Sequence, residues 1–179
     1  MARDQAPPHG LDQVIDFVNT RDIDRGTDAL GSASDLRAWL AAHGHRGASR
    51  ATAADLEAAH ALREALRAVL LAHNGATPDS AAAAVLDGVA QAGGLGVRFG
   101  RDGAELVAGG GVTGALANLL IPVVRAGADG SWPRVKACLG EGCAWAFYDR
   151  SRNRSGRWCD MTVCGNRAKV RTYRGRRAG

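Results

Sequence analysis

Several patterns that mark common classes of protein are missing from this sequence. The first ten residues are polar and contain prolines, without the apolar core of a secretory signal, and no apolar run approaches the length of a membrane span. No internal repeat is visible. We therefore expect a cytoplasmic protein that has no membrane partner.

Sets of residues typical of enzyme active sites are missing as well. The five histidines are scattered, and none is paired with a nucleophile in the way that a catalytic triad requires. The run 109–114 fits the G-x-G-x-x-G pattern of dinucleotide binding, but the strand before it already belongs to an expected hairpin, and no series of βαβ units follows. We therefore predict that the protein is not an enzyme, and we interpret this run as a flexible loop.

Cysteine is absent from the first 137 residues and then occurs four times, in two pairs of the form C-x-x-x-x-C. Each short loop can supply two corners of a tetrahedron, so the two pairs together predict a structural zinc site. Its ligands would be Cys138, Cys143, Cys159 and Cys164. Four thiolates leave no open position for water, which argues against catalytic zinc. Two alternatives are disulfides, which a reducing compartment disfavours, and a redox switch in which oxidation expels the metal.

The residues around the cysteines fit this interpretation. Gly140 and Gly142 lie within the first loop and Gly165 follows the last cysteine, where a chain turning back toward a metal needs positive φ or close backbone approach. Trp145 and Trp158 flank the cysteines and could shield them from water. A segment of about 45 residues buries too little apolar surface to fold alone, so we expect it to be unfolded without metal.

Charge divides the chain near residue 131. From Trp132 to Gly179 there are 12 Lys and Arg and 3 Asp and Glu, a net charge of +9, whereas the remaining residues have a net charge of −4. A basic segment joined to an acidic body is typical of a polyanion-binding protein, because Lys and Arg displace the counterions of phosphates.

Hydrophobic periodicity predicts a helical body before this boundary. The expected helices are residues 11–20, 34–44, 52–73, 78–92 and 112–130. Thr52 is a suitable N-cap, and Pro122 either kinks the last helix or starts a second one. The segment 21–32 is interpreted as a loop. Alternating runs at 96–100 and 104–108, around Arg101-Asp102-Gly103, predict a β-hairpin.

The C-terminal sequence resembles the CGNR zinc-finger family. The tetrapeptide that names the family stands at 164–167, and the run 145–153 (WAFYDRSRN) and Arg157-Trp158-Cys159 precede it in the family's order. The resemblance covers about residues 132–174. It implies a zinc-bearing C-terminal segment of transcription regulators that binds DNA.

The front of the chain resembles the ABATE domain, which commonly precedes the CGNR finger. The resemblance rests on 11–22 (LDQVIDFVNTRD), 35–44 (DLRAWLAAHG) and 62–70 (LREALRAVL). Its most distinctive residues are Asp16, Phe17, Asn19 and Thr20.

Two groups of basic residues are the candidate nucleic-acid contacts. One lies in the loop between the cysteine pairs and consists of Arg150, Arg152, Arg154 and Arg157. The other follows the last cysteine and consists of Arg167, Lys169, Arg171 and Arg174. On a helix, Arg167, Arg171 and Arg174 would share one face, at spacings of four and three. The alternative is a solvated basic face that binds nothing specific, and the choice between DNA and RNA stays open.

Two further interpretations concern single polar residues. We expect the Asn166 amide to be structural, as a helix cap or as a bond to the neighbouring loop. In the body, Asn19, Thr20 and Arg63 could line a pocket for a small effector. Helix caps and surface contacts are the alternative use of these three residues.

The sequence therefore predicts an α+β protein in two parts. Residues 1–130 would form a mainly helical body with a β-hairpin, which senses an effector or forms a homodimer. Residues 131–179 would form a four-cysteine zinc finger of strands plus a C-terminal helix, with a basic tail. The predicted function is DNA binding in transcription regulation. The alternatives are a finger that docks on RNA or protein, and a body that acts on a small molecule.

Overall fold

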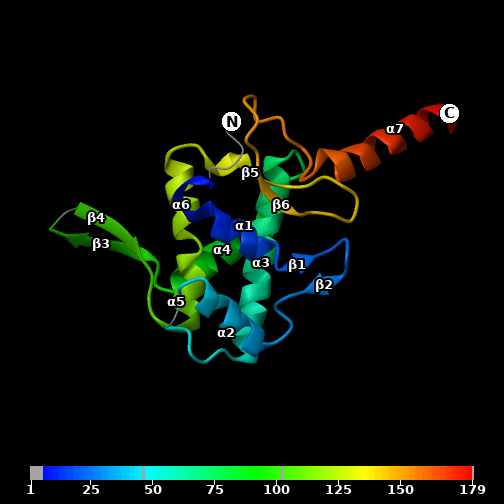
Figure 1. The fold of residues 1–179 in the computed structure, drawn as a ribbon. Coiled ribbons are helices and arrows are strands. Elements are labelled where there is room, and N and C mark those ends of the chain that lie inside the picture. Colours follow the sequence, from blue (N-terminus) through cyan, green and yellow to red (C-terminus); the bar gives the residue numbers. More distant parts are fainter. Residues whose placement is uncertain (1–5, 46, 102, 179) are drawn as a thin grey trace.

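The computed structural model describes residues 6–45, 47–101 and 103–178, and it shows a helical body joined to a smaller C-terminal segment (Figure 1). The helices of the body are α1 (Leu11–Val18), α2 (Ala33–Ala42), α3 (Ala53–His73), α4 (Ser80–Ala92), α5 (Gly111–Asn118) and α6 (Ile121–Ala128). Single 3-10 turns lie at Pro8–Gly10 and Trp132–Arg134. The predicted fold class is confirmed.

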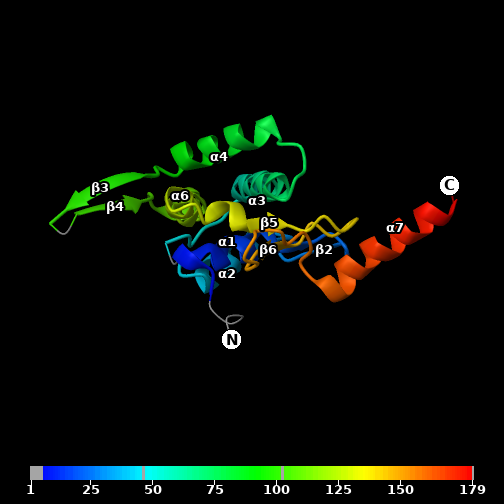
Figure 2. The same cartoon turned by 90° about the horizontal axis from the view of Figure 1, so that it is seen from above.

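Helix α3 is the centre of the body and contacts α1, α2, α4 and α5. Figure 2 shows α4 on one side of α3, with α1 and α2 on the other. Thr52 caps α3 as predicted. Its hydroxyl accepts a hydrogen bond from the backbone N–H of Asp55, and the Asp55 carboxylate accepts one from the backbone N–H of Thr52. Leu62, Leu66 and Leu70 recur every four residues and are each 0% exposed. Burial of each contributes about 1.5–3 kcal/mol.

The ends of the other helices differ little from the predictions. Helix α2 is capped by Ser32 and begins at Ala33 rather than at residue 34, and α1 ends at Val18 rather than at residue 20. Pro122 starts a second helix rather than kinking the first. It lies in the first turn of α6, where its missing N–H removes no helical hydrogen bond.

The stretch 111–128 corrects one expectation. By length and composition alone, this stretch could cross a membrane. No apolar run of that length was expected from the sequence. In the structure it is divided between α5 and α6, and 56% of it is buried inside the protein. Packing against the body therefore accounts for its apolar side chains.

Two antiparallel hairpins extend from the body. The first, β1 (Arg21–Asp22) with β2 (Thr27–Asp28), lies in the segment interpreted as a loop. The second, β3 (Gly96–Gly100) with β4 (Gly103–Val107), is the predicted hairpin and projects away from the helices in Figures 1 and 2. Asp102, the first residue of its expected Asp-Gly turn, lies outside the described residues.

The C-terminal segment begins against the body and ends far from it. Strands β5 (Val135–Ala137) and β6 (Ala146–Tyr148) pair antiparallel and contact α3 and α1, respectively. Val135, Ala137 and Ala146 belong to the same core as the body helices. A π-helical turn at Met161–Gly165 then leads into α7 (Asn166–Ala178), which projects outward (Figures 1 and 2). The boundary at residues 130 and 131 stays a prediction, because the apolar core continues across it.

Candidate metal centre and basic surface

The first cysteine pair lies in the loop between β5 and β6. Cys138 follows β5 directly, and the Cys143 amide donates to the Gly140 carbonyl at 3.0 Å, which closes the loop into a turn. A Cβ on Gly140 would lie 3.1 Å from the Cys164 Sγ and 3.3 Å from the Cys143 Cβ. Gly142 has a φ of +71°, a conformation that side chains disfavour. The predicted need for glycine in this loop is therefore confirmed at both positions.

The second pair is built on the turn that starts α7. The Asp160 carboxylate accepts from the amides of Thr162 and Val163, at 2.6 Å and 3.2 Å, and so caps the turn. The turn brings Cys164 back toward Cys159, with 3.8 Å between their sulfurs. Local capping therefore shapes the turn that positions this pair.

The structure brings all four cysteines together as predicted. Their sulfurs all lie within 4.8 Å of one another, and the Cys143 and Cys159 sulfurs, one from each pair, are 3.7 Å apart. A tetrahedron with metal–sulfur bonds of about 2.3 Å needs about 3.8 Å between sulfurs. This donor set therefore fits a four-thiolate metal site.

The cysteines of the cluster differ in how readily they ionise. Burial alone would raise the pKa of Cys138, but hydrogen bonds lower it, whereas the pKa values of Cys143 and Cys159 are raised. Burial, followed by the charge of Cys138, raises the pKa of Cys143 to about 11. The same two causes, in the same order, raise the pKa of Cys159 strongly. Four clustered thiols therefore do not all ionise on their own near neutral pH, and a bound cation would supply the missing compensation.

Trp158 is half-buried and packs close to the second pair. A Cβ on Gly165 would lie 2.7 Å from the Met161 sulfur and 3.3 Å from the Trp158 ring. Trp145 is also half-buried, and its carbonyl accepts from the Cys138 amide at 2.9 Å. Both predicted tryptophans therefore lie beside the cysteines.

Side chains of the body hold the backbone around the first pair. The Asn19 amide pairs with both backbone atoms of Ala146, donating to its carbonyl at 3.0 Å and accepting from its N–H at 2.7 Å. The Asn74 amide donates to the carbonyls of Ala137 and Arg157 at 2.7 Å and 3.0 Å. The body thus supplies hydrogen bonds that a strand would otherwise take from another strand.

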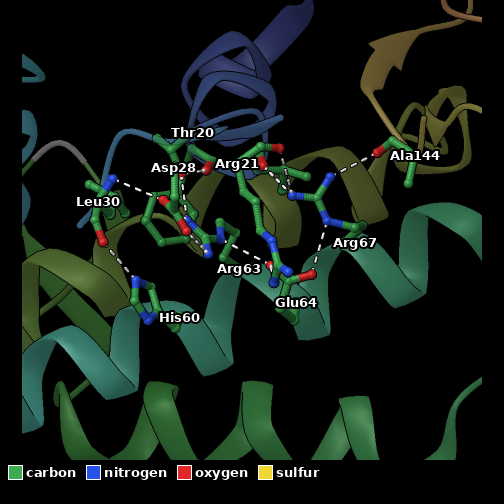
Figure 3. A network of polar contacts seen from close by, with 11 residues as sticks. Thr20, Arg21, Asp28, Leu30, His60, Arg63, Glu64, Arg67 and Ala144 are labelled. Atoms are coloured by element: carbon green, nitrogen blue, oxygen red, sulfur yellow. Dashed lines mark hydrogen bonds and ion pairs between the residues drawn. The ribbon is translucent and has the colours of Figure 1, made fainter. Parts of the chain in front are cut away.

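The structure uses the polar atoms of the three proposed effector-pocket residues in internal hydrogen bonds. Asn19 is occupied by Ala146, as above. Arg63 is 1% exposed and forms a two-point ion pair with Asp28, with both N–O distances 2.7 Å (Figure 3). Thr20 accepts from Arg63 at 3.1 Å and donates to the Phe17 carbonyl. These contacts are internal bonds, and Arg63 forms neither the helix cap nor the surface contact that was the alternative.

All eight predicted nucleic-acid contacts are exposed, and six of them line three different hollows. Arg167, Arg171 and Arg174 line one hollow of about 710 Å³ beside Glu141, as expected for one helix face. Lys169 lies along another hollow with Trp158. Two of the helix arginines already have partners, since Arg167 pairs with Asp24 at 3.2 Å and Arg171 pairs with Glu141.

The loop arginines lie elsewhere. Arg150 and Arg152 line a hollow next to Pro8, and the Arg150 guanidinium lies 5.7 Å from the centre of the Tyr148 ring. The other two have backbone roles, because the carbonyl of Arg154 accepts from Lys136 and that of Arg157 accepts from Asn74. The structure therefore does not join the two predicted groups into one patch.

Asn166 has a structural bond, as expected, but does not cap the helix. Its amide donates to the Thr162 carbonyl at 2.9 Å, while Asp160 is the capping residue.

Sequence reasoning missed a buried ion pair within the C-terminal segment. Lys136 and Asp149 are 5% and 3% exposed, with 2.7 Å between Nζ and Oδ2. Burial alone would raise the pKa of Asp149, but hydrogen bonds from Lys136, Ser151 and Gly156 lower it to about 2. The Asp-x-Ser spacing, which suits an Asx turn, is the signal that could have identified Asp149.

Comparison with known families agrees with this architecture. A family model named ABATE, with the description "Putative stress-induced transcription regulator", matches residues 11–130. A second model, the CGNR zinc finger, matches residues 134–177. No curated protein matches the chain. Both resemblances drawn from the sequence are confirmed in the predicted order, and the chain belongs to the ABATE family, with a CGNR zinc finger following the family domain.

Proposed function

We propose that the protein is a zinc-dependent DNA-binding regulator of transcription, in which the metal orders a basic helix that contacts phosphates. The observation that carries this proposal is the position of α7. It starts at the second cysteine pair and projects from the body (Figure 1). Its Arg167, Arg171 and Arg174 line one hollow.

Zinc suits the donor set best. Thiolates prefer soft or borderline ions, and a closed tetrahedron of four thiolates is a common structural zinc site. Zinc would compensate the thiolates and join the turn before α7 to the loop between β5 and β6. The proposal includes no catalytic step, because four thiolates leave no position for a reacting water.

Shape and charge support a nucleic-acid partner. Helix α7 has 13 residues, a length of about 20 Å, and an α-helix of ordinary width fits the major groove of DNA. The formal charge of +9 for residues 132–179 falls to about +7 when zinc and four thiolates are included. Phosphate contacts would then supply most of the affinity, and base contacts the specificity.

Duplex binding at several salt concentrations tests the proposal. Arg174→Ala should weaken binding to all sequences alike and flatten the slope of log affinity against log salt by about 0.9. Arg37→Ala is the matched control, since Arg37 is an exposed arginine on α2 and its loss removes the same charge from the body. Equal slopes in the two variants would remove Arg174 from the contact surface.

The same assay distinguishes the alternatives. Structured RNA that binds more tightly than duplex DNA would favour the RNA reading, and zinc binding without affinity for either would favour a protein partner. The regulatory part of the proposal keeps a sensing or dimerising role for the body and a cytoplasmic location. An effector remains an expectation, and so does the pocket of Asn19, Thr20 and Arg63, whose polar atoms already form internal bonds.

A further inference from the structure

We infer that Arg67, on the central helix of the body, is a positioning residue for the metal centre. Its guanidinium donates to the Ala144 carbonyl at 2.8 Å, and Ala144 directly follows the ligand Cys143 (Figure 3). This inference rests on the zinc site of the proposed function and assigns it a support from a different domain.

Two arginines of α3 show why Arg67 is distinctive. Arg63 and Arg67 lie one turn apart, are 1% and 3% exposed, and both bond to Glu64. Buried arginines are rare unless their charge and their N–H groups are satisfied. Arg63 is satisfied within the body, by the carboxylate of Asp28 and by Thr20.

Arg67 is satisfied mainly by backbone carbonyls from distant parts of the chain. Besides Glu64 and Ala144, it donates to the carbonyls of Val18 at 2.6 Å and Arg21 at 3.3 Å. One side chain therefore joins the end of α1, the start of β1 and the loop that carries the first cysteine pair. In Figure 3 its guanidinium lies between these segments.

The bonded carbonyl belongs to an unusual residue. Ala144 has a φ of +48°, a left-handed conformation that costs a residue with a Cβ about 1–2 kcal/mol. Such a conformation persists only where the surroundings hold it. Arg67 holds the carbonyl of Ala144, and Asn19 holds the backbone of Ala146 two residues further on. Together they fix the turn that leads the chain from Cys143 into β6.

This turn determines where one ligand points. With the turn in place, the Cys143 sulfur lies 3.7 Å from that of Cys159, near the separation that a shared metal needs. Outer-shell residues that orient ligands typically change metal affinity by about 10- to 100-fold when they are removed. Loss of Arg67 should therefore weaken zinc binding beyond any effect on overall stability.

The test compares Arg67→Met with Arg63→Met in the full-length protein. Both changes remove a buried guanidinium from the same face of α3, but only the first breaks a contact to the finger. Zinc affinity is measured by competition with a chromophoric chelator, cobalt(II) spectra report the ligand geometry, and thermal unfolding reports stability. We expect Arg67→Met to lose zinc affinity by about 10- to 100-fold and to change the cobalt spectrum. Arg63→Met should keep both while also losing stability.

The lysine variants complete the design. Arg67→Lys keeps a charge and donors, so it should recover part of the zinc affinity, and Arg63→Lys is its control. If the methionine variants do not fold, the zinc affinities and cobalt spectra of Arg67→Lys and Arg63→Lys are compared instead. Equal zinc affinities and cobalt spectra in the Arg67 and Arg63 variants would overturn the inference while leaving the zinc site intact. A wild-type protein that binds neither ion would instead overturn the zinc site itself.

Discussion

The two halves of the zinc finger differ in what holds them. The seated half, residues 134–158, places Val135, Ala137 and Ala146 in the core of the body and receives hydrogen bonds from Asn19 and Asn74. In the projecting half, residues 159–178, only Cys164 and Gly165 are buried among the side chains described. The core of the body thus stabilises the seated half, whereas the proposed metal would stabilise the projecting half.

This difference refines the expectation that the whole finger unfolds without metal. The seated half has apolar burial and interdomain hydrogen bonds, both of which exist before any ion binds. The projecting half has a capped turn, a helix with four arginines among its described side chains, and exposed ion pairs. We therefore expect metal dependence to be concentrated after Cys159.

Removal of the metal should produce the largest effect. A structural zinc contributes about 10–16 kcal/mol of apparent binding free energy. In hydrogen exchange with a chelator present, the amides of α7 should lose protection, while those of α3 and β5 keep it. Loss of protection in β5 and β6 as well would show that both halves depend on the ion, and a protected α7 would show that neither does.

A pair of asparagines offers a matched test of the two halves. Asn74 is buried and donates two hydrogen bonds to the seated half, whereas Asn166 is exposed and donates one within the projecting half. Asn74→Ala removes the side-chain donor of the buried Ala137 carbonyl, whereas the Arg157 carbonyl still accepts from the Leu139 N–H. The change should cost about 1–3 kcal/mol. Asn166→Ala should cost less than about 1 kcal/mol, because water can replace its bond. Urea unfolding measures both, and equal costs would contradict the proposed difference in support.

Acid should loosen the seated half through Asp149. Its pKa of about 2 in the folded protein lies below the ordinary value, so its contribution is present above about pH 4 and is lost as pH falls toward 2. The shift corresponds to about 2 kcal/mol. The difference in unfolding free energy between wild type and Asp149→Asn should shrink by about that amount from pH 5 to pH 2. A constant difference would show that the carboxylate of Asp149 is not held as described.

Several features with a local signal were predictable from the sequence. Thr52 as a cap, the β3–β4 hairpin and the two cysteine loops all follow from neighbours within a few residues. The short β1–β2 hairpin was nevertheless missed, and the sequence left two roles open for Pro122. It was also predictable that the two loops lie together, because one tetrahedral metal site needs ligands from both.

Pairings between distant residues were not predictable in the same way. Asn19 meets Ala146 across a separation of 127 residues, and Arg67 meets Ala144 across 77. Arginine and lysine are usually exposed, so neither Arg67 nor Lys136 is marked as buried by its type. The internal bonds of Asn19, Thr20 and Arg63 were not predictable for the same reason: polar residues on apolar helices indicate either a ligand site or an internal bond, and only tertiary structure distinguishes them.

The smallest expected effect concerns the exposed ion pair between the body and α7. Arg167 and Asp24 lie 3.2 Å apart with side chains 57% and 47% exposed, and such pairs contribute about 0–1 kcal/mol. Asp24→Asn should therefore leave urea unfolding nearly unchanged. If α7 contacts phosphates, the variant should still bind duplex DNA more tightly, because Asp24 no longer competes for Arg167. Asp87→Asn on α4 is the control, since it removes the same charge far from the finger in sequence. An equal gain in both variants would mean that net charge, rather than release of Arg167, raises the affinity for DNA. The ion pair between Arg167 and Asp24 would then have no specific effect on DNA binding by the projecting half.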